Sequence, residues 1–209
     1  MLMGGVNFRR DALRSGLETL AQPGCLATSF EFFSTDDIDR LKQFSLSLPM
    51  RKARPVVGAP GREVTQDFDI CFPAPRLDAL DDLTSMLEEL IDDVAGDTDV
   101  LDTPFELNDL AVQHYPPQSR GIGVHMDSLR YRGLVFIITL DGSSRFCVCD
   151  DREGSGARVL DESPGRLGLL SAPGFAGREG EGSRPFHFVD RITGGRLSIG
   201  LRHNSKPPD

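Results

Sequence analysis

Hydrophobic residues in the first half of the chain recur at helical spacing. The clearest stretch places its apolar residues along one stripe and its acids on the opposite side, and Gly96 follows the last turn. The stripe consists of Leu77, Leu80, Leu83, Leu87, Leu90, Ile91 and Val94. We predict an amphipathic helix that is buried along this face. The acidic side is expected to be solvated, because the ligand spacing of a calcium loop is absent.

Two further helices and two strands are predicted before this helix. The first helix is marked by Leu13, Leu17 and Leu20. It is expected to end at Pro23-Gly24, and Ser34 is a suitable N-cap for a second helix that continues to Leu48. The stretches LATSFEFF and QDFDICF have the composition of strands. Residues 50–63 are rich in Pro, Gly and basic side chains without an apolar period, which predicts a long loop and is typical of an active-site lid.

The second half of the chain shows short alternating runs separated by Gly, Pro and Asp. Eight such runs are present: LAVQHY, GIGVHMD, LVFIITL, RFCVCD, ARVLDE, GRLGLLSA, PFHFVDRI and GRLSIGLRH. Eight short strands with this punctuation predict a double-sheet jelly roll. The predicted fold class is therefore α+β, a double-stranded β-helix (jelly roll) with the N-terminal helices packed on one sheet. We expect a single domain over residues 1–209, with helical support in 1–105 and a jelly-roll core in 106–204.

The net charge and the amino-acid composition indicate in which cell compartment the protein lies and which partners it can bind. The chain has 209 residues, 32 acidic and 23 basic, for a net charge of −9. The negative electrostatic field of such a chain disfavours nucleic acid as a partner. It does not exclude nucleic acid, because a local basic patch can still attract phosphates. The N-terminus lacks an apolar signal core, no stretch has the length of a membrane span, and the four cysteines suit a reducing compartment. We expect a cytoplasmic protein without a membrane partner, and the oligomeric state stays open.

Four residues in the second half carry the candidate chemistry. His125 and Asp127 stand two apart on a predicted strand, so their side chains share one face and can hold one ion together. His187 completes a two-histidine, one-carboxylate set, which leaves coordination positions open and suits non-haem Fe(II). Arg196 can hold a carboxylate co-substrate through two parallel hydrogen bonds. The pattern indicates an oxygenase. Two alternatives remain. The residues could form a zinc or cupin-type site without a co-substrate, or His125 and Asp127 could be an ordinary pair of surface residues.

Three stretches together resemble the Fe(II)/2-oxoglutarate-dependent dioxygenases, and among them the AlkB-like branch most. They are HYPPQSRGIGVHMD, RPFHFVD and the arginine pair in RLSIGLR. The resemblance covers residues 105–204. It implies His125, Asp127 and His187 as iron ligands, with 2-oxoglutarate and O2 as co-substrates. It also implies cofactor-binding residues around the metal: Arg196 for the distal carboxylate, with Ser198, Tyr115, Arg202 and Gln113. At Gln113 the chain departs from the family, which usually carries Asn there.

The resemblance implies oxidation of a C–H bond, by hydroxylation or a related outcome, with release of succinate and CO2. We favour a small-molecule substrate, because the chain is acidic, lacks Trp and has only two Tyr for stacking on a base. An AlkB-like oxidative demethylase of nucleic-acid bases, a protein or peptide hydroxylase and a non-catalytic ligand-binding module are the alternatives. A lid over residues 50–63 would close over the substrate and exclude water.

Overall fold

The computed structural model describes residues 5–96 and 98–206. Its three helices are those that the sequence predicts: α1 (Val6–Ala21), α2 (Thr35–Ser47) and α3 (Asp78–Ala95). Ser34 caps α2 as expected, because its hydroxyl accepts from the backbone N–H of Asp37 while the Asp37 carboxylate accepts from the backbone N–H of Ser34. Within the described part of the chain, no helix combines the length and apolar character needed to cross a bilayer.

The strands form two antiparallel sheets. The seven-stranded sheet has the order β1-β11-β8-β13-β6-β5-β2, and the six-stranded sheet has the order β10-β9-β12-β7-β4-β3. Their bounds are β1 (Ala27–Glu31), β2 (Arg51–Lys52), β3 (Val56–Val57), β4 (Val64–Asp67), β5 (Asp69–Cys71), β6 (Asp109–Tyr115), β7 (Gly121–His125), β8 (Tyr131–Gly142), β9 (Arg145–Cys149), β10 (Arg158–Val159), β11 (Arg166–Ser171), β12 (Phe186–Asp190) and β13 (Arg196–Asn204). Two short 3-10 helices, η1 (Phe175–Gly177) and η2 (Glu181–Ser183), precede β12. All eight strands predicted in the second half are present.

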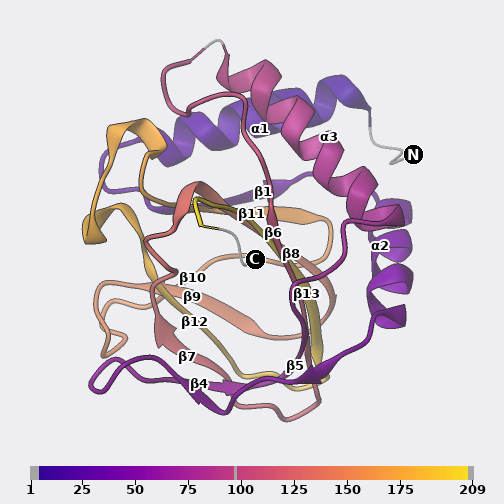
Figure 1. The fold of residues 1–209 in the computed structure, drawn as a ribbon, viewed down its shortest axis with the longest axis vertical. Coiled ribbons are helices and arrows are strands. Elements are labelled where there is room, and N and C mark those ends of the chain that lie inside the picture. The colour runs from indigo at the N-terminus through magenta and orange to yellow at the C-terminus, as the bar shows by residue number, and fades with distance from the viewer. Residues whose placement is uncertain (1–4, 97, 207–209) are drawn as a thin grey trace.

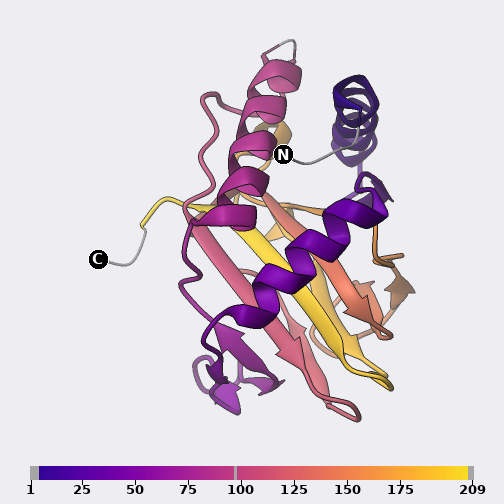
Figure 2. The same ribbon diagram turned by 90° about the vertical axis from the view of Figure 1, so that its right-hand side faces the viewer.

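All three helices cover the outer face of the seven-stranded sheet (Figure 1, Figure 2). The larger hydrophobic core lies in this layer, where leucines of the helices pack on alternate residues of β8 and β13. A smaller core, which includes Phe68, Tyr115 and Phe146, lies between the two sheets. The predicted α+β jelly roll with helices on one sheet is therefore confirmed. The first hundred residues also supply strands to both sheets, at the β1, β2 and β5 positions and at β3 and β4.

The segment 50–63 differs from the predicted long loop. It contains β2, which pairs with β5, and β3, which forms a hairpin with β4. These strands are two residues long, so they leave no periodicity in the sequence. They lie at the sheet edges, and pairing with β5 and β4 determines them. Arg51, Lys52, Arg54 and Arg62 are all exposed on this segment. Its role as a lid, the single-domain organisation and the cytoplasmic location stay predictions.

Candidate active site

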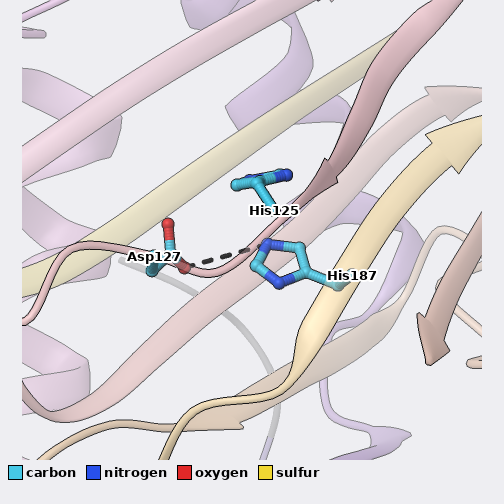
Figure 3. Close-up of side chains that lie close together, drawn as sticks. All are labelled: His125, Asp127 and His187. Carbon is cyan, nitrogen blue, oxygen red and sulfur yellow. Dashed lines mark ion pairs between the residues drawn. The ribbon is translucent and has the colours of Figure 1, made fainter. Parts of the chain in front are cut away.

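The two histidines meet on the six-stranded sheet, and Asp127 joins them from the loop after β7, which ends two residues earlier than the predicted strand GIGVHMD. His125, at the end of β7, lies directly opposite His187 of the neighbouring strand β12. Their ring centroids are 4.2 Å apart, and Nε2 of His187 lies 3.9 Å from Oδ2 of Asp127 (Figure 3). One ligand atom from each of the three residues falls within 4.8 Å of the others. The pairing of β7 with β12 thus brings the two histidines together, and Asp127, two residues beyond the end of β7, reaches them from the following loop.

Backbone carbonyls orient both imidazole rings. Nδ1 of His125 lies 2.8 Å from the carbonyl oxygen of Gly123, and Nδ1 of His187 lies 3.2 Å from that of Pro185. In the tautomer that donates from Nδ1, the Nε2 lone pair of each ring is free to bind a metal. Each ring thus contacts a carbonyl oxygen two residues before it in the chain.

The electrostatics of the cluster favour a neutral His125 imidazole and an ionised Asp127 carboxylate. Burial, together with the nearby His187, lowers the pKa of His125 to about 4. Burial alone would raise the pKa of Asp127, but His187 and Arg202 hold it below its ordinary value. Metal ions bind these protonation states. Three nitrogen and oxygen donors on one face, with room for further ligands, fit non-haem Fe(II).

Arg202 lies beside the predicted metal ligands. It lines the same cavities as His125 and Asp127. Nη1 of Arg202 donates to Asp109 at 3.3 Å, and its guanidinium lies 5.2 Å from the Tyr131 ring centre. Its buried Nε has no hydrogen-bond partner among the described residues. Arg202 therefore keeps a free donor close to the predicted metal site.

Arg196 has a different environment from the one expected. Its side chain is almost completely buried and forms a two-pronged ion pair with Glu162, in which Nε lies 3.0 Å from Oε1 and Nη2 donates to Oε2. Nη1 donates to the hydroxyl of Ser198. Sequence reasoning missed Glu162, because it lies in the loop after β10 and no local pattern links it to Arg196.

The remaining predicted residues surround a small cavity between the sheets, of about 50 Å³. Gln113, Tyr115, Arg196, Ser198 and Arg202 line it together with the three predicted ligands. The Tyr115 hydroxyl donates to Gln113 at 3.3 Å, and burial raises the pKa of Tyr115 to about 12, so this phenol stays protonated. The structure thus places all eight sequence-predicted site residues around one cavity.

A wider pocket of about 300 Å³ also reaches two of the predicted metal ligands. The residues that it shares with the small cavity are Gln113, Ile122, His125, Asp127 and Arg202. Its other walls are mainly apolar and come from several strands and loops: Val57, Val64, Phe68, Ile70, Phe72 and Met126. Arg184, a second residue missed in the sequence, donates from Nη1 to the backbone carbonyl of Asp127 and so fixes the chain at this predicted ligand.

Comparisons with known proteins support the same fold. No family profile and no curated protein sequence matches the chain. Among solved structures, a Pseudomonas putida prolyl-4-hydroxylase has a TM-score of 0.63 at 15% identity, covering 92% of this chain and 98% of its own. A 2OG-Fe(II) oxygenase family oxidoreductase from Burkholderia pseudomallei has a TM-score of 0.65 at 14% identity, covering 98% and 93%. The chain has the fold of the 2-oxoglutarate- and Fe(II)-dependent oxygenases.

An AlkB-type structure is among the neighbours as well. OsALKBH1 has a TM-score of 0.55 at 15% identity and covers 81% of this chain and 91% of its own. The prolyl hydroxylases match at similar identity and with higher TM-scores. The resemblance to the oxygenase superfamily is therefore confirmed at the level of fold, and the closer likeness to the AlkB-like branch stays a prediction.

Proposed function

We propose that this protein is an Fe(II)- and 2-oxoglutarate-dependent oxygenase that oxidises a C–H bond of a small molecule and releases succinate and CO2. The observation that carries the proposal is the convergence of His125, Asp127 and His187 within 4.8 Å, in a fold shared with such oxygenases. Fe(II), when bound there with 2-oxoglutarate and O2, supplies the oxidising chemistry.

The protein's own residues hold the reactants and exclude water. The imidazoles of His125 and His187 and the Asp127 carboxylate would hold the metal, with the rings oriented by backbone carbonyls. The free Nε of Arg202 offers a charged donor beside the metal to the oxo-acid end of the co-substrate. Arg196 and Ser198, at the other end of the small cavity, would meet the distal carboxylate, with Tyr115 and Gln113 along the same wall.

The wider pocket supports a small-molecule substrate. Its volume of about 300 Å³ lies at the lower end of the range for ligand pockets, and its walls are mainly apolar. The exposed basic residues of 50–63 do not line it, whereas Val57 and Val64, on β3 and β4, do. We therefore expect the part of the substrate nearest the metal to be apolar rather than anionic.

An AlkB-like demethylase is the second candidate. The observations in its favour are the likeness to OsALKBH1 and the two arginines six residues apart on β13. The net charge of −9 counts against a long nucleic-acid partner. Binding of methylated oligonucleotides that persists at moderate salt would favour this candidate over a small-molecule oxygenase.

Anaerobic loading with Fe(II) and 2-oxoglutarate, followed by addition of O2, tests the proposal. We expect succinate to form slowly without a substrate and faster with a suitable member of an apolar metabolite panel, with methylated oligonucleotides as the comparison arm. The His187→Ala variant should form none. Failure of the iron-loaded wild type to consume 2-oxoglutarate under any of these conditions would refute the proposed activity.

A further inference from the structure

Arg196, which lines the small cavity, forms a buried ion pair with Glu162. Arg196 is the first residue of β13, and Glu162 lies in the loop between β10 and β11. The Arg196 and Glu162 side chains are 2% and 8% exposed. Both charges would be costly to bury alone, so the pair stabilises the charged form of each. Accordingly, burial on its own would lower the pKa of Arg196, but Glu162 raises it above the usual value.

Glu162 is fixed by groups other than Arg196. Its Oε2 accepts a hydrogen bond of 2.8 Å from the Thr139 hydroxyl, and its Oε1 accepts one of 2.7 Å from the Ser144 hydroxyl. Together with Nε and Nη2 of Arg196, the two oxygens receive four hydrogen bonds. A carboxylate held by two hydroxyls has a defined place in the protein and can in turn define the place of the guanidinium.

The two edges of the Arg196 guanidinium have different roles. The edge formed by Nε and Nη2 is occupied by Glu162, whereas Nη1 donates to Ser198. Arg196 and Ser198 both line the cavity that contains the predicted metal ligands. Glu162 is not among the described residues that line it. The guanidinium plane also lies over the Tyr115 ring, 5.2 Å from its centre, which restricts its rotation.

We propose that Glu162 is a positioning residue that aims Arg196 at the distal carboxylate of the co-substrate. The inference rests on the proposed function. Glu162 holds one edge of the guanidinium, so that Nη1 and the Ser198 hydroxyl are the donors presented to the cavity. Selection of a 2-oxo acid with a second carboxylate then depends on a residue that never contacts the co-substrate. Binding of a 2-oxo acid without a second carboxylate does not depend on it.

Titration calorimetry on Mn(II)-loaded protein without O2 tests this directly, with 2-oxoglutarate and 2-oxobutyrate as the two ligands. The Glu162→Gln variant should bind 2-oxoglutarate at least about tenfold more weakly, a change of about 1.4 kcal/mol. Its affinities for Mn(II) and 2-oxobutyrate should match the wild type. The Glu179→Gln variant, which loses a surface partner of Arg132, is the matched control and should bind both acids normally.

Two milder variants keep the test valid if Glu162→Gln folds poorly. Ser144→Ala removes one hydroxyl from Glu162 and should weaken 2-oxoglutarate binding a few-fold, again without an effect on 2-oxobutyrate. Glu162→Asp keeps the charge but shortens the reach, and should fall between Glu162→Gln and the wild type. Unchanged or tighter 2-oxoglutarate binding in these variants, or equal losses for the two acids, would overturn the inference. A wild type that binds Mn(II) but neither acid would instead refute the proposed function.

Discussion

The two faces of β13 carry opposite kinds of side chain. On the face toward the helices, Leu197, Ile199 and Leu201 are buried in the larger core. On the face toward the other sheet, Arg196, Ser198 and Arg202 line the cavity beside the predicted metal ligands. Alternation along one strand therefore separates stability from chemistry within a single element. The helix-facing side stabilises the fold by burying apolar surface. The opposite side carries buried charges, whose desolvation costs free energy of folding.

The largest expected effect on the cavity side is loss of a metal ligand. His125→Ala should weaken Fe(II) or Mn(II) binding by more than about 100-fold, because removal of even an outer-shell partner commonly costs 10- to 100-fold. The melting temperature of the metal-free protein should change little. Metal titration and thermal unfolding check this, and His114→Ala, on the neighbouring sheet, is the control. A variant that retains normal metal affinity would remove His125 from the site.

The helix-facing side should respond in the opposite way. Leu201 is completely buried and does not line the cavity, and Leu201→Ala should lower the free energy of unfolding by about 2 to 5 kcal/mol. Metal affinity of the folded variant should stay within about twofold of the wild type. Urea unfolding and metal titration separate the two quantities. Val159→Ala changes an aliphatic residue that is 65% exposed and should leave both unchanged. A large loss of metal affinity in Leu201→Ala would show that the two faces are not separable.

A pH dependence should come from the cavity side. The folded pKa of His125 is lowered to about 4, below the usual value of about 6.5, so between these values the unfolded chain binds a proton that the folded protein does not. The contribution of His125 to stability is fully present above about pH 6.5 and is lost as the pH falls toward 4. The melting temperature of chelator-treated protein should fall by several degrees over this range. His125→Gln should show a smaller fall, and an equal fall in both proteins would contradict the assignment.

The smallest effect is expected at Gly200, between Ser198 and Arg202 on the cavity face. A Cβ added there would lie 2.8 Å from Nη2 of Arg202, the flexible end of that side chain. Gly200→Ala should therefore displace the guanidinium and weaken 2-oxo acid binding a few-fold, with little change in stability. Calorimetry with 2-oxoglutarate and 2-oxobutyrate measures the effect, which should be equal for both acids because Arg202 lies near the metal. A loss confined to 2-oxoglutarate would place Arg202 at the distal carboxylate instead.

The sequence alone determined the elements and the predicted ligands. Helical stripes, N-cap chemistry and alternating runs located all three helices and the eight strands of the second half, because these signals are local. The i and i+2 spacing of His125 and Asp127 predicted that they lie close together, although Asp127 reaches the site from the loop after β7 and not from the strand itself. His187 was found because its strand and its motif are also local.

Only the tertiary structure decided what surrounds Arg196. Glu162 lies 34 positions earlier, at the end of the predicted strand ARVLDE but outside β10, and the contact exists because β13 and the loop after β10 pack side by side. The short edge strands β2 and β3 are likewise determined by pairing with β5 and β4, since two residues are too few to show a period. Helices and strands are predicted by patterns among neighbouring residues. Contacts between distant segments depend on how the two sheets pack, and no short stretch of sequence predicts that packing.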